Sequence, residues 1–132
     1  MDKKEQIEAA LEEAKSLLEN SRLVEAEKKT EAILEEYPNN GEALYIKAVC
    51  QRYLNRLEEA LATLRQLKKI RPGYGRAFQE EGHVCMAAGF TSQALYAYRH
   101  AVSLNNSLIA SWAGLTKIHT KQGNHDNAKI TN

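Results

Sequence analysis

The chain has 132 residues, of which 43% are hydrophobic and 27% are charged, and its formal net charge is +1. This length is ordinary for one domain, and the near-neutral charge argues against a nucleic-acid-binding domain, which is usually strongly basic. No run approaches the roughly 18 apolar residues of a membrane span, and the N-terminus has no apolar signal region. We therefore expect a cytoplasmic protein that binds neither nucleic acid nor membrane.

The composition also predicts the fold class, because Leu, Ala, Glu, Lys, Gln and Arg dominate and all are strong helix formers. An all-α fold is expected. Cys50 and Cys85 both fall within predicted helices, which favours buried, reduced thiols over a disulfide. Charge is unevenly spread, with a net of −5 over residues 1–40 and +4 over residues 41–75. This asymmetry can steer the approach of a partner.

A period of 34 residues runs through the chain. The two prolines, Pro38 and Pro72, are 34 residues apart, and blocks of this length begin at positions 7, 41, 75 and 109. The twentieth residue of each block is alanine, and the eighth is mostly small. These residues are Ala26, Ala60, Ala94 and Ala128 at the twentieth position, and Ala14, Ala48, Gly82 and Thr116 at the eighth. Columns that recur in phase indicate internal repeats.

Each block divides into two predicted helices, joined at its fifteenth residue. That residue suits a turn in every block: Ser21, Asn55, Gly89 and Gly123. In the second block the helices are expected over 42–54 and 57–70, and Pro72 ends the pair because proline cannot continue a helix. The small columns are expected where the two helices cross.

The fourth block is shorter than the others. We expect a first helix over 108–122, a turn at Gly123–Asn124, and the start of a second helix at Asp126. The last seven residues are too few to form a stable helix alone. The chain is therefore interpreted as the N-terminal piece of something longer, with a frayed natural end as the alternative.

The period, the small columns and the terminal proline resemble the tetratricopeptide repeat over residues 7–132. The resemblance implies a right-handed superhelical stack of antiparallel helix pairs. It implies one domain over 1–132, with repeats at about 7–40, 41–74, 75–108 and 109–132, the last incomplete. It also implies a non-catalytic scaffold that binds a protein or peptide.

A search for chemistry agrees with a protein that is not an enzyme. His119 and His125 lie six residues apart, which is no familiar metal spacing, and neither cysteine belongs to a Cys-x-x-Cys pair. No glycine-rich phosphate loop is present. The basic run at 65–71 is explained by the negative end of a helix, which favours cations. We therefore expect no catalytic residue, no metal and no cofactor.

In the resembling family the first helix of each pair lines a concave groove, which we call the inner face. The exposed inner positions are about the second, fifth, ninth and twelfth of each block. The candidate partner-binding residues at these positions are Tyr45, Val49, Arg52, Arg76, Gln79, His83, Met86 and Lys117. An aromatic ring, a methionine and several cations suit a peptide with some acidic character. Val49 and Met86 have an equal alternative, which is packing between adjacent first helices.

One familiar activity of the family is disfavoured. Some of its members grip the C-terminal carboxylate of heat-shock chaperones with a clamp of Lys, Asn, Asn, Lys and Arg. The corresponding residues here are Leu11, Lys15, Ile46, Arg76 and Glu80, of which Arg76 alone fits.

Two alternatives to the scaffold stay open. Residues 76–83 and 104–112 resemble the N-terminal repeats of bacterial proteins that end in a sulfotransferase domain. This resemblance implies an accessory module that positions a substrate for an enzyme domain. The other alternative is a homodimer that forms through the incomplete C-terminal repeat, since an unpaired helix face favours association.

Overall fold

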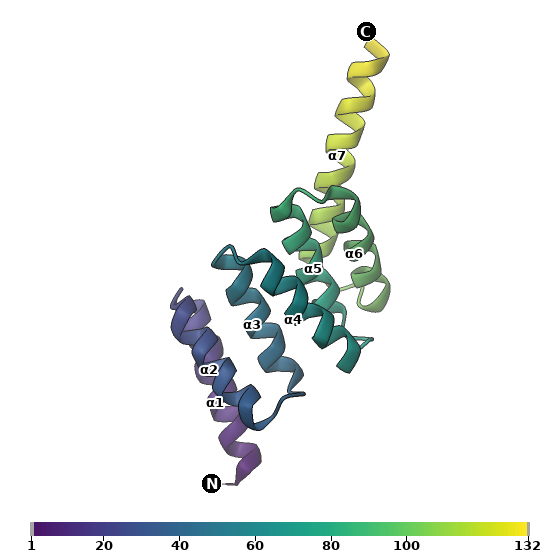
Figure 1. Ribbon diagram of the computed structural model, residues 1–132. Helices are drawn as coiled ribbons and strands as arrows, with labels where there is room; N and C mark the ends of the chain where they lie inside the picture. Colours follow the sequence, from purple (N-terminus) through teal and green to yellow (C-terminus); the bar gives the residue numbers. More distant parts are fainter. Residues whose placement is uncertain (1, 132) are drawn as a thin grey trace. The chain divides into compact units, whose positions relative to one another are not determined.

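A computed structural model describes the backbone of residues 2–131 and the side chains of residues 2–123. Every regular element within residues 2–131 is an α-helix (Figure 1). The helices are α1 (Lys3–Glu19), α2 (Leu23–Glu36), α3 (Gly41–Tyr53), α4 (Leu57–Ile70), α5 (Gly75–Ala88), α6 (Thr91–Leu104) and α7 (Ile109–Thr131). The all-α prediction is confirmed. Among the residues described, no helix has the length and apolar character needed to cross a membrane.

Helices α1, α3 and α5 end in the same tight turn. The turn residues Ser21 and Asn55 have φ of 61°, and Gly89 has φ of 82°, so all three occupy the left-handed region. The next backbone N–H in each turn donates to a carbonyl five residues earlier, at 2.8 Å: Arg22 to Leu17, Arg56 to Gln51, and Phe90 to Cys85. A left-handed residue that closes a helix in this way reverses the chain. Each turn therefore folds the following helix back against the preceding one.

The helices repeat with the predicted period. Helices α2, α4 and α6 begin at Leu23, Leu57 and Thr91, a spacing of 34 residues. The alanines of the twentieth column, Ala26, Ala60 and Ala94, are all 0% exposed. Their small side chains let the paired helices approach closely. The fourth alanine of that column, Ala128, lies outside the residues whose side chains are described.

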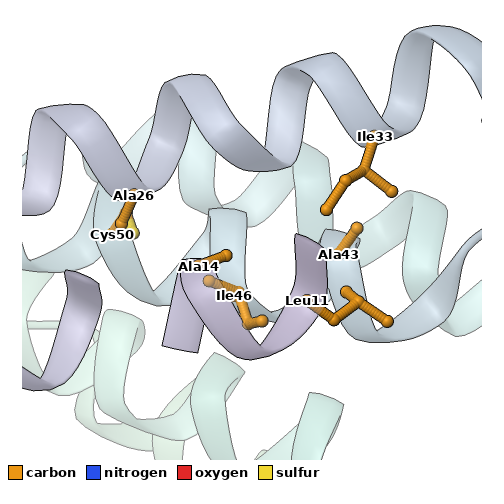
Figure 2. Packing of buried hydrophobic residues seen from close by; sticks show 7 residues of the cluster. All are labelled: Leu11, Ala14, Ala26, Ile33, Ala43, Ile46 and Cys50. Atoms are coloured by element: carbon orange, nitrogen blue, oxygen red, sulfur yellow. The ribbon is translucent and has the colours of Figure 1, made fainter. Parts of the chain in front are cut away.

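The chain divides into two compact units, unit 1 (Met1–Pro72) with α1 to α4 and unit 2 (Gly73–Asn132) with α5 to α7. In unit 1 the side chains of α1, α2 and α3 gather into one core (Figure 2). The members of this cluster are Leu11, Ala14, Ala26, Ile33, Ala43, Ile46 and Cys50. Helix α3 therefore packs against both helices of the first pair, which removes its apolar surface from water.

A buried ion pair joins the two helix pairs of unit 1. The carboxylate of Glu27, on α2, is buried and accepts a hydrogen bond from the guanidinium of Arg56, at the start of α4. Burial raises the pKa of the Cys50 thiol to about 11, and the negative charge of Glu27 adds to the increase. Both cysteines are buried and free, so their predicted burial is confirmed.

In unit 2 a buried tyrosine fills the space between three helices. Tyr98, on α6, is 2% exposed, and a hydrogen bond of 2.7 Å joins its hydroxyl to Nδ1 of His83 on α5. A Cβ atom placed on Gly82 or on Gly114 would lie 2.5 Å from the Tyr98 ring. The ring is therefore held between the backbones of α5 and α7, and only glycine leaves room for it at both positions.

The predicted turn at Gly123–Asn124 is wrong, because α7 continues as one helix from Ile109 to Thr131. Its C-terminal half extends beyond α5 and α6 (Figure 1). Gly89 turns in the equivalent position of the third block because α6 then buries Tyr98 and Ala94 against α5.

Candidate functional site

The predicted inner face of unit 1 contains a cleft of about 390 Å³, which we call the Tyr53 cleft. It lies where the C-terminal ends of α1 and α3 meet the turn between α1 and α2. Its walls are formed by Leu18, Glu19, Ser21, Leu23, Val49 and Tyr53. Leu18 and Val49 occupy inner positions of the first and second blocks, but Val49 is buried, so its predicted exposure is wrong. The structure therefore provides an apolar recess on the surface that the repeat pattern assigns to a partner.

An exposed aromatic ring borders this cleft, and a cation lies over that ring. Tyr53 is 59% exposed, and the guanidinium carbon of Arg52 lies 4.4 Å from the centroid of its ring. A cation over the face of an aromatic ring is attracted by the ring's quadrupole and holds the ring in one orientation. Arg52 was predicted as an inner residue, whereas Tyr53 was missed because it follows the inner column by one residue.

A second cleft, of about 450 Å³, lies at the opposite end of the same two helices. We call it the Lys3 cleft. Three cations line it, Lys3, Lys4 and Arg71, together with the apolar or aromatic side chains of Ile7, Leu11 and Tyr37. Glu8, Asn40 and Glu42 complete its walls. Sequence analysis missed the three cations because they lie outside the inner columns.

An ion pair connects α1 and α3 between the two clefts. Nζ of Lys15, on α1, lies 3.5 Å from a carboxylate oxygen of Glu42, on α3. The charge of Glu42, followed in effect by that of Glu12, raises the pKa of Lys15. Because the pair is exposed to solvent, its main effect is on the local charge and not on stability. Tyr45, also a predicted inner residue of α3, is half-buried in this unit.

In unit 2 the predicted residues have mixed surroundings. Arg76 and Lys117 are exposed, and Met86 is half-buried. Gln79 is half-buried, and its Oε1 accepts hydrogen bonds from the backbone N–H of Ser111 at 3.0 Å and from its hydroxyl at 2.8 Å. His83 bonds to Tyr98, as described above. Gln79 and His83 therefore also hold α5 to α7 and α6, so substitution of either would affect folding as well as binding.

The described residues form no arrangement suited to a metal. Among them no group of three or more His, Cys, Asp or Glu side chains is placed to hold an ion. Of the two histidines in the predicted six-residue spacing, His119 is exposed and the side chain of His125 lies outside the described residues. The chemistry that these surfaces offer is binding by apolar recesses, an aromatic ring and cations.

A family model described as "Tetratricopeptide repeat" matches residues 17–80. This stretch contains α2, α3 and α4 with their left-handed turn, and the same helix spacing continues through α5, α6 and the start of α7. Residues 17–80 carry tetratricopeptide repeats. No curated protein sequence matches it.

Several solved structures share this fold, and two of them are named as tetratricopeptide repeat (TPR) domains. The first TPR of Spaghetti (RPAP3), bound to an HSP90 peptide, is 15% identical, with 90% of this chain and 94% of that chain covered and a TM-score of 0.81. The Sgt2 TPR domain from Aspergillus fumigatus is 16% identical, with 92% and 82% covered and a TM-score of 0.84. An O-GlcNAc transferase from Thermobaculum terrenum is 22% identical, with 85% and 22% covered and a TM-score of 0.81.

These similarities establish the fold of the repeats. The resemblance to sulfotransferase-linked repeats stays a prediction. The clamp for chaperone tails remains disfavoured here, because Leu11, Ile46 and Glu80 stand at clamp positions and are all buried.

Proposed function

We propose that this TPR chain is a non-catalytic scaffold that binds a peptide segment on the surface of its first helices. In unit 1 the Tyr53 cleft is the anchor, and it receives a large apolar side chain of the partner. The observation that carries this proposal is the coincidence of an apolar recess with inner positions that the repeat assigns to binding, at Leu18 and Val49.

The chemistry of the cleft defines what it holds. Leu18, Leu23 and Val49 offer an apolar floor, and Tyr53 provides one wall that remains exposed. Exposed aromatic residues beside an apolar recess carry a large share of the binding energy in many interfaces. The guanidinium of Arg52 lies over the face of the Tyr53 ring. A leucine, methionine or aromatic side chain would fill this apolar floor and contact the Tyr53 ring.

A matched pair of tyrosines provides the test. Peptides of about 12 residues, long enough to span α1 in extended form, are selected from a random phage-displayed library on the whole chain. Binding of the selected synthetic peptides is then measured for Tyr53→Ala and for Tyr96→Ala. Tyr96 is 75% exposed and lies on α6, a second helix, so its loss removes an equivalent ring from the outer surface.

The two variants have different expected results. Tyr53→Ala weakens binding by about tenfold or more, the effect of losing a central aromatic contact. Tyr96→Ala leaves the affinity unchanged. If the library yields no binder, or if Tyr53→Ala binds as tightly as the wild type, the proposal is wrong. Far-UV circular dichroism of both variants checks that helicity is intact.

Two further roles stay predictions, each with one supporting observation. The match to part of an O-GlcNAc transferase supports an accessory module of a larger enzyme, which sequencing the reading frame beyond Asn132 would test. The exposure of Trp112 and Ile109 on α7 supports a homodimer through the last repeat. Sedimentation equilibrium tests the homodimer, because Trp112→Ala should convert a dimer to monomers if this face forms the interface.

A further inference from the structure

The Lys3 cleft combines positive charge with an apolar floor at the far end of the proposed peptide surface. Lys3 and Lys4 come from the first turn of α1, and Arg71 follows the last turn of α4. Ile7 and Leu11 form the floor. The cleft also contains the first residues of α1 and α3, whose helix dipoles place partial positive charge there.

A glycine positions the arginine. A Cβ atom on Gly41 would lie 2.6 Å from Nε of Arg71, so the guanidinium rests against the start of α3 where a larger residue would displace it. Arg71 is thereby held beside the cleft, although it belongs to the loop after α4. The sequence distance between Lys3 and Arg71 explains why the charge pattern could not be seen in any one helix.

Two acidic side chains share the cleft with the three cations. Glu8 and Glu42 also line the cleft, which leaves three cations against two carboxylates. Glu42 in addition faces Lys15 at 3.5 Å, so part of its charge is compensated within the protein. The net field in the cleft therefore favours an anionic group from a partner.

We propose that the Lys3 cleft binds an aspartate or glutamate side chain of the same peptide whose apolar side chain occupies the Tyr53 cleft. This inference rests on the proposed function and adds the class of partner, which is an acidic peptide that contacts both clefts. Lys3, Lys4 and Arg71 bind the carboxylate, and Ile7 and Leu11 contact the aliphatic part of the same segment.

The length of α1 sets the spacing within the peptide. Lys4 and Leu18 are fourteen residues apart on one helix, which corresponds to about 21 Å at about 1.5 Å per residue. An extended peptide advances about 3.3 Å per residue, so the acidic residue lies about six positions from the apolar anchor. Peptides with both features at a shorter separation can occupy only one cleft at a time.

Charge exchange tests the proposal with the library-selected peptides described above. The binding variant is Lys3→Glu with Lys4→Glu, which also suits the start of a helix because acidic residues are favourable there. The matched control is Lys28→Glu with Arg65→Glu, which makes the same charge change at exposed positions on α2 and α4. Each chain is tested against a selected peptide and against the same peptide with its acidic residue replaced by lysine.

The selected peptides should contain an acidic residue about six positions from an apolar one, and their affinity should fall by about tenfold in the Lys3→Glu, Lys4→Glu chain. The lysine-substituted peptide should bind that chain better than it binds the wild type, while the control variant changes neither affinity by more than about twofold. If the peptides bind through Tyr53 but show no acidic preference, or if both charge variants weaken binding equally, this inference is wrong and the proposed function stands. If no peptide binds, both are wrong.

Discussion

Replacement of Gly82 by alanine tests the packing that holds unit 2 together. In an open helix this change stabilises a protein by about 1 kcal/mol, because glycine is a poor helix former. Here the new Cβ would lie 2.5 Å from Cε1 of Tyr98, and the ring cannot move away because Gly114 contacts its other edge. Overfilling a packed core costs about 1–3 kcal/mol, and a ring confined on both sides calls for the upper end of that range. We therefore expect a net loss of about 2 kcal/mol in the free energy of unfolding.

Urea unfolding followed by Trp112 fluorescence measures this loss, because the only tryptophan of the chain lies in the same unit as Gly82. The control is Gly123→Ala, in the interior of α7, where an added Cβ would meet no atom within 4 Å. That variant should be as stable as the wild type or more stable by up to about 1 kcal/mol. If Gly82→Ala is stabilised to the same extent as Gly123→Ala, the confinement of Tyr98 does not limit this position and the reasoning is wrong.

Three more predictions concern unit 1. The folded chain holds the Cys50 proton more tightly than the unfolded chain does, because its pKa is raised to about 11. The free energy of unfolding should therefore fall by about 2 kcal/mol as the pH rises from 9 toward 11. Cys50→Ala should flatten the pH profile of thermal unfolding. Arg56→Ala should lower the free energy of unfolding in urea, because it leaves the buried Glu27 carboxylate without its partner. Equal stability of the wild type and the variant would contradict this. Asn40→Ala should cost about 1 kcal/mol, since the Asn40 side chain caps α3 at 2.9 Å, whereas Asn40→Asp should retain most of the stability.

Much of the fold follows from the repeat columns. The alanines Ala26, Ala60 and Ala94 are fully buried because two helix backbones cross over each of them, and this requirement is the same in every repeat. The left-handed turns at Ser21 and Asn55 also recur with the repeat, because a three-residue connection between paired helices needs one residue with positive φ. Such features depend on contacts within a repeat and therefore appear in the sequence as a period.

Other features depend on contacts that the period does not describe. Gly89 and Gly123 stand in the same column, yet Gly89 turns and Gly123 lies within α7. The contact of Gly114 with Tyr98 joins residues of two different repeats, so the pattern within one repeat does not predict it.

Only those residues of the candidate site that lie at inner positions of the repeat could be predicted from the sequence. Leu18 and Val49 stand at inner positions of their blocks, and the structure brings them together in one recess. Tyr53 lies one residue beyond its column. Lys3 and Arg71 are near opposite ends of unit 1 in the sequence, and only the folded chain brings them to one cleft. Charge that is assembled from distant segments leaves no local signal in a sequence.

The most direct test of peptide binding on the first helices is an NMR titration of the ¹⁵N-labelled chain with a library-selected peptide. We expect the largest amide shift changes in unit 1 at Leu18, Val49 and Tyr53, with a second group near Lys4, and small changes along α2 and α4. Changes confined to α2 and α4, with the amides of Leu18 and Tyr53 unmoved, would contradict the account and place the partner on the second helices.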